Sequence, residues 1–194
     1  MTYANIIGVL GGIMTLASTY FYVPSILRGE TRPHIFTWLV WSLVLAIGCA
    51  AQLAGGAALG ACAVGGSALS CIVITIVSIK YGERDITRSD WVALIAALAI
   101  IPVWQATGDP LVAAILVTII DTLGYWPTVR KSWRKPWGEA YAIYVISGIA
   151  YVLALSAVAQ WNLTTVLYPA VLVVWDFGLT GLILMRRRAL AQAA

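Results

Sequence analysis

The chain has 194 residues, of which 61% are hydrophobic and 10% are charged, and its formal net charge is +4. Soluble domains carry about 25% charged residues, so a chain this apolar has too few polar side chains to cover a water-soluble surface. The composition excludes an ordinary soluble protein and predicts an all-α membrane protein with the lipid bilayer as a partner.

Seven apolar segments are long enough to cross a bilayer. A transmembrane helix takes about 20 apolar residues, and about 17 at the least. In chain order, the predicted spans are residues 4–23, 35–54, 58–80, 91–107, 111–129, 139–159 and 163–185. An odd number of spans places the two ends of the chain on opposite sides of the membrane.

The basic residues indicate which side is which. They follow the first, third, fifth and seventh spans only: Arg28, Arg32, Lys80, Arg84, Arg88, Arg130, Lys131, Arg134, Lys135, Arg186, Arg187 and Arg188. The loops near residues 55–58, 106–110 and 159–163 contain no Lys or Arg. Because cytoplasmic loops carry the excess of Lys and Arg, the pattern predicts an outside N-terminus and a cytoplasmic C-terminus, rather than a nucleic-acid partner.

Two similar phrases predict an internal repeat. Residues 22–33 read YVPSILRGETRP and residues 125–136 read YWPTVRKSWRKP, at a constant offset of 103 residues. The offset pairs the first three spans with the last three and leaves the fourth alone. We therefore expect two parallel three-helix bundles, residues 1–82 and 111–194, joined by a linker helix in residues 83–110. A duplication kept only for packing is the alternative.

This layout of three, one and three helices resembles the PQ-loop superfamily, which includes the SWEET sugar facilitators. The chain is also similar to a group of bacterial membrane proteins that carry the same two phrases. The resemblance implies a transporter that works by alternating access in the bacterial inner (plasma) membrane. The Pro-Gln dipeptide of the family is Pro24-Ser25 and Pro127-Thr128 here, and the asparagine pair of the SWEET sugar site is missing. KDEL receptors share the helical plan, so a non-transporting receptor or sorting protein is the alternative.

The repeated prolines have two interpretations. Pro24 and Pro127 each remove a backbone donor from the helix. They act either as paired hinges near the cytoplasmic mouth, as the resemblance implies, or as simple helix terminators before a polar loop. Trp41 and Tyr144, which are repeat counterparts in the second and sixth spans, are predicted to form an inner gate or to pack in the core.

A stripe of polar residues repeats on the first and fifth spans. Spacings of three, four and three residues put the members of each stripe on one helix face. Two such faces gain nothing from lipid contact, so we expect them to face inward and line a pathway, although hydroxyls also join transmembrane helices. The stripes are Thr15, Ser18, Tyr22 and Ser25, and then Thr118, Asp121, Tyr125 and Thr128.

Two of the eight acids lie inside predicted spans. Asp121 and Asp176 are each about ten residues into a span, or ~15 Å deep in a core of ~30 Å. An intramembrane acid is by default a functional-site hypothesis, here proton uptake and release or pairing with a cationic solute. Two protonated, purely structural acids are the alternative. The other six acids, expected in loops or at span ends, are Glu30, Glu83, Asp85, Asp90, Asp109 and Glu139.

These patterns predict a carrier of a small polar or cationic solute, such as a sugar or an amino acid. Trp175 is added to the site because it adjoins Asp176, and Ser70 because the repeat matches Asp176 with a position near Ser70. No nucleophile–base motif, phosphate-binding loop or metal-ligand spacing is present, so no enzyme activity and no cofactor are expected; a homo-oligomer is left open. The predicted lining is Thr15, Ser18, Ser70, Thr118, Asp121, Tyr125, Trp175 and Asp176.

Overall fold

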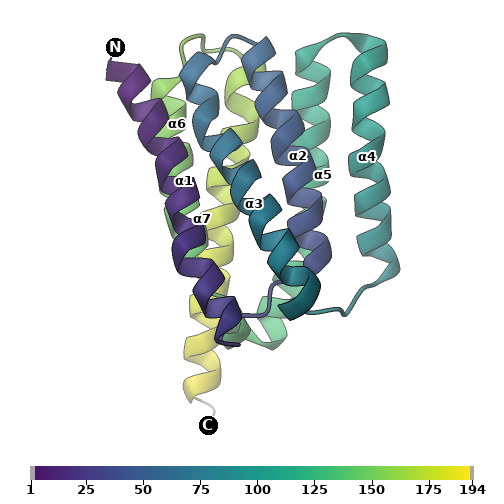
Figure 1. Ribbon diagram of the computed structural model, residues 1–194, viewed down its shortest axis with the longest axis vertical. Helices are drawn as coiled ribbons and strands as arrows, with labels where there is room; N and C mark the ends of the chain where they lie inside the picture. Colours follow the sequence, from purple (N-terminus) through teal and green to yellow (C-terminus); the bar gives the residue numbers. More distant parts are fainter. Residues whose placement is uncertain (1–2, 193–194) are drawn as a thin grey trace.

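The computed structural model describes residues 3–192, which form seven α-helices, two short 3-10 helices and no strand (Figure 1). The α-helices are α1 (Tyr3–Leu27), α2 (Ile35–Ala54), α3 (Cys62–Tyr81), α4 (Arg88–Thr107), α5 (Pro110–Arg134), α6 (Ala142–Ala157) and α7 (Leu163–Gln192). The 3-10 helices are η1 (Ala58–Ala61) and η2 (Pro136–Gly138).

Six segments of the described chain are long and apolar enough to cross a bilayer, which indicates a multi-pass membrane protein. The exception is α6, which has 16 residues, whereas residues 139–159 were predicted to form this span. The helix is short because Glu139 is extended, after η2, and Val158 is extended at the other end. Even so, α6 runs beside α1 and α7.

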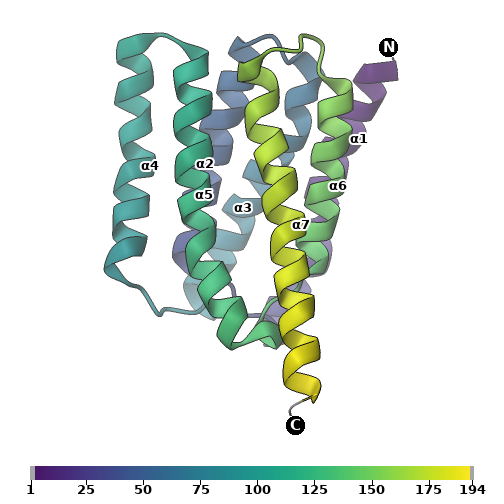
Figure 2. The same ribbon diagram turned by 180° about the vertical axis from the view of Figure 1, so that it is seen from behind.

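Six helices enclose a common interior. Around the molecule, each packs against the next in the order α1, α3, α2, α5, α7, α6 and back to α1 (Figures 1 and 2). We call this arrangement the helix ring. The packing is the same in both halves of the chain, since α1 contacts α3 as α5 contacts α7, and α2 contacts α5 as α6 contacts α1. Helix α4 lies outside the ring, against α5 and α2.

The basic residues gather at one end of the ring. The connections from α1 to α2, from α3 to α4 and from α5 to α6 all lie at the lower end in Figure 1, together with the C-terminal turns of α7. These segments, together with the adjoining turns of α3, α4 and α5, contain every Lys and Arg of the chain. The N-terminal end of α1 lies at the opposite end. The helices therefore alternate in direction, and each pair of repeat counterparts runs the same way.

Helix continuity excludes one interpretation of the prolines. Helix α1 continues past Pro24 to Leu27, and α5 continues past Pro127 to Arg134. Neither residue ends its helix, so simple termination is wrong for both. Near its lower end, α5 changes direction in Figure 2. The hinge interpretation stays a prediction.

The start of α5 depends on a cap that the sequence encodes. Asp109 accepts a hydrogen bond from the backbone N–H of Leu111 at 2.8 Å, and Pro110 occupies the first helical position. Loss of an N-cap side chain costs about 1 kcal/mol. We expect Asp109→Ala to lower the free energy of unfolding in detergent micelles by about that amount. The exposed Gln105→Ala should change it by less than about 0.5 kcal/mol; equal effects would contradict the capping role.

Candidate functional site

A cavity lined by both polar and apolar side chains lies inside the helix ring, and all six ring helices contribute to its wall. The space open to the centre of a water molecule is about 40 Å³. One water molecule needs about 10–15 Å³ of such space. The cavity therefore has room for a few waters and must widen before a solute the size of a sugar can enter.

The two intramembrane acids meet at this cavity. Asp121 on α5 and Asp176 on α7 both line it, with exposed fractions of 1% and 3%. Tyr168 donates a hydrogen bond to Oδ1 of Asp121 at 3.3 Å, and Tyr125 donates one to Oδ1 of Asp176 at 3.0 Å. The Oδ2 atom of each acid is buried and has no partner among the described residues.

These two free oxygens need an explanation. Most buried polar atoms in proteins are hydrogen-bonded, and an unpaired one costs about 1–3 kcal/mol. Both free oxygens belong to residues of the same cavity wall, Asp121 and Asp176. Such a pair is suited to hold protons, to hydrogen-bond water, or to bind a ligand that donates hydrogen bonds or carries positive charge.

The hydroxyl groups on the opposite wall join helices as well as line the cavity. Ser70 on α3 donates to the carbonyl oxygen of Thr15 on α1 at 2.8 Å. Ser18 donates to the same carbonyl at 2.6 Å. Tyr151 on α6 also donates a hydrogen bond to Ser67 on α3 at 2.7 Å. Of the eight predicted lining residues, Thr15, Ser18, Ser70, Asp121, Tyr125 and Asp176 line this cavity.

The other two predicted lining residues lie outside the wall. Thr118 is buried, but its hydroxyl donates to the carbonyl oxygen of Ala114 in its own helix at 2.7 Å. Trp175 lies behind Tyr125, with the two rings stacked at 5.0 Å between centroids. Its indole N–H donates to Thr122 at 3.1 Å. Successive residues of an α-helix point about 100° apart, so Trp175 does not share the direction of the acid that follows it.

An aromatic cluster borders the cavity. Trp41 on α2 packs against Trp38 at 5.1 Å, against Tyr125 at 4.5 Å and against Tyr144 on α6 at 6.3 Å between ring centroids. Tyr22 on α1 continues the cluster through Trp38 at 5.1 Å. The predicted gate residues, Trp41 and Tyr144, thus come together in one cluster that joins both halves of the chain and lines the cavity.

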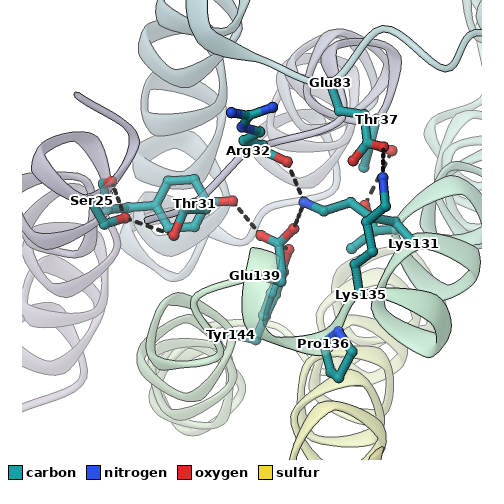
Figure 3. Close-up of polar contacts among 12 residues, drawn as sticks. Ser25, Thr31, Arg32, Thr37, Glu83, Lys131, Lys135, Pro136, Glu139 and Tyr144 are labelled. Carbon is teal, nitrogen blue, oxygen red and sulfur yellow. Dashed lines mark hydrogen bonds and ion pairs between the residues drawn. The ribbon is translucent and has the colours of Figure 1, made fainter. Parts of the chain in front are cut away.

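Beyond the aromatic cluster, towards the basic end, lies a buried ionic network that the sequence did not reveal (Figure 3). Glu139, 1% exposed, accepts hydrogen bonds from Tyr22 and Tyr144 on Oε1 and pairs with Lys131 through Oε2. Lys131 also donates to the backbone carbonyl of Arg32. We call these contacts the Glu139 network; they join α1, the α1–α2 loop, α5 and α6.

The sequence predicts that Glu139 lies at a span end and that Lys131 is a cation in a loop. The offset of 103 residues pairs Glu139 with Phe36, so the repeat gives the acid no counterpart. The available signal was a single acid between Pro136 and an apolar run, close to a cation in the sequence. That signal does not say whether the side chain turns inward.

A second buried polar group holds α4 against the ring. Asp90, 1% exposed, bonds to the backbone N–H of Thr87 at 2.6 Å and lies 3.7 Å from His34 Nε2 and 3.9 Å from a guanidinium nitrogen of Arg130. His34 also approaches the carbonyl oxygen of Asp85 at 3.1 Å. The sequence placed Asp90 in a loop or at a span end. This group joins the start of α4 to α2 and α5.

The site of greatest chemical interest is therefore the cavity with Asp121 and Asp176, closed on one side by aromatic rings and the Glu139 network. Its two acids are the groups in it that can exchange protons most readily, since phenols and thiols ordinarily stay neutral near pH 7. Scans of this chain against family models, curated proteins and solved structures find no match.

Proposed function

We propose that the protein is a transporter that carries a small polar solute across a bacterial plasma membrane by alternating access. The observation that carries the proposal is the cavity inside the helix ring, in which Asp121 and Asp176 each keep one unpaired carboxylate oxygen. The interface between two equivalent sets of helices is where transporters with parallel repeats bind their substrates.

The moving parts are the two halves of the chain, residues 1–82 and 111–194, with residues 83–110 as the linker. The halves meet along two seams, between α1 and α6 and between α2 and α5. Thr128 donates to Thr37 across the second seam at 3.2 Å, and Tyr22 contacts Glu139 across the first. Contacts of this kind exchange when the halves rock against each other around the site.

The basic end faces the cytoplasm, and the N-terminus faces outside, by the positive-inside rule. The Glu139 network and the aromatic cluster then form the cytoplasmic gate, which is closed in this conformation. Pro24 and Pro127 lie close to this gate in α1 and α5, and they are the positions at which we expect these helices to flex.

Flux through proteoliposomes tests the proposal. The purified protein should take up at least one solute of a panel of sugars, amino acids and small amines. Asp176→Asn should slow that uptake by about tenfold or more, because a hydrogen bond to a charged group is worth about 1.5–3 kcal/mol. Asp121→Asn should act in the same direction.

The matched control for these variants is Glu30→Gln, an acid at the surface that pairs with Arg28 at 2.7 Å. It should leave uptake unchanged. Saturable binding of a panel member without any flux would contradict transport and favour the receptor alternative. Equal uptake by wild type and both aspartate variants would remove the acids from the site.

A further inference from the structure

We propose, on the basis of the proposed function, that the solute is a small organic cation and that the protein exchanges it for protons. Three features of the cavity support this proposal: its balance of charge, the groups that face the two acids, and the aromatic rings beside them.

The cavity wall carries two acids and no base. Asp121 and Asp176 line it, and no Lys, Arg or His of residues 3–192 does so. The buried cation Lys131 is already paired with Glu139, which in turn accepts a hydrogen bond from the cavity residue Tyr144. A positively charged ligand could pair with an ionised aspartate of this wall, whereas an anion would find no cation there to pair with.

The other titratable groups around the two acids are ordinarily neutral. Helix α1 contributes hydroxyls and α2 contributes indoles and a leucine, none of which titrates near neutral pH. The remaining ring helices contribute phenols and one thiol: Tyr125 from α5, Tyr144 and Tyr151 from α6, Tyr168 from α7 and Cys71 from α3. The charge state of the cavity therefore depends on the two aspartates.

Proton exchange follows because the two aspartates have no cation beside them in the cavity. An ionised carboxylate without a partner is too costly in an apolar interior, so the empty site is most stable with protons on its acids. When a cation binds, a carboxyl O–H bond breaks and its electron pair stays on the oxygen, which then pairs with the cation. The proton passes to water on the side to which the cavity is open. One proton leaves for each positive charge bound, so the exchange is electroneutral.

The aromatic cluster favours an organic cation over a metal ion. Trp41, Tyr125 and Tyr144 line the cavity beside the acids, and aromatic ring faces attract organic cations. A metal ion needs several oxygen, nitrogen or sulfur ligands. The described residues contain no group of three or more His, Cys, Asp and Glu side chains that could hold one. The hydroxyls of Ser18 and Ser70 suit a polar group on the same ligand.

Proteoliposomes that enclose a pH-sensitive dye give the test. Choline and guanidinium are suitable probes because both stay charged and cross lipid poorly. Added outside wild-type vesicles, at least one should make the interior more alkaline as the cation enters and protons leave. Asp121→Asn and Asp176→Asn should each slow this change by about tenfold or more. Glu30→Gln, at the surface, should not.

A binding measurement covers the case in which a variant folds poorly. Choline or guanidinium added to weakly buffered, detergent-solubilised wild type should release one proton for each cation bound. Binding without proton release would overturn the exchange. Uptake of glucose without proton movement, with both cations inert, would overturn this inference and leave a transporter. No flux of any probe, with binding intact, would overturn the proposed function itself.

Discussion

Lys131→Met should lower the free energy of unfolding by about 3–5 kcal/mol, the usual cost of removing one partner from a buried ion pair. The exposed fractions of the Lys131 and Glu139 side chains are only 5% and 1%. The variant leaves the charge of Glu139 buried between Tyr22 and Tyr144, without its cation. Thermal unfolding in detergent micelles, followed by tryptophan fluorescence, measures the loss.

The chain contains a matched control four residues away. Lys135 pairs with Glu83 at 3.1 Å, but 69% of the lysine side chain is exposed, and exposed ion pairs contribute about 0–1 kcal/mol. Lys135→Met should therefore have little effect. The double variant Lys131→Met with Glu139→Gln should recover much of the lost stability, because no unpaired charge remains. Similar losses in Lys131→Met and Lys135→Met would contradict the network.

Gly66→Ala should lower the free energy of unfolding, because the added methyl group has no space between α1 and α3. A Cβ atom at Gly66 would lie 2.6 Å from the backbone carbonyl oxygen of Gly12, so α1 and α3 would have to move apart. It would also overlap the hydroxyl of Thr15, which lines the cavity. Overpacking of this kind costs about 1–3 kcal/mol. We expect a loss of that size in micelles, together with reduced solute uptake.

Gly178→Ala is the control for this prediction. Gly178 lies in α7, where an added Cβ would meet no atom within 4 Å apart from its chain neighbours and the surrounding helix backbone. Alanine is favoured over glycine in a helix by about 0.5–1 kcal/mol, so the variant should be neutral or slightly more stable. If Gly66→Ala were as stable as Gly178→Ala, the close approach of α1 to α3 would be wrong.

Periodicity explains what could be predicted about the site. The residues of each polar stripe share a helix face, and all eight of them are buried. The same logic placed Asp121 and Asp176 at similar depth on neighbouring helices, and they line one cavity. Helical spacing fixes which residues share a face, and the cost of exposing polar groups to lipid fixes which way that face turns.

Local backbone geometry explains what could not be predicted. Glu139 has an extended backbone and lies between η2 and α6. The conformation of this turn, and not a helical period, directs its side chain towards Lys131. Trp175 adjoins Asp176 in the sequence, yet the helix points it towards Thr122. Thr118 shares the face of Asp121 but lies about one helical turn away, outside the cavity wall. The direction of a side chain that adjoins a predicted site residue, or that lies in a loop, can be read only from the three-dimensional structure.

The position of α4 has a mechanical consequence. This helix bridges α2 and α5, so it ties the two halves together along one flank, where Asp90 adds contacts to His34 and Arg130. Among residues 3–192, no α-helix outside the ring packs against both α1 and α6, and the polar contacts at the basic end of that flank include the bond from Tyr22 to Glu139. Two bodies that are held together along one edge separate most along the opposite edge. Under the proposed transport mechanism, we therefore expect the solute to leave beside α1 and α6.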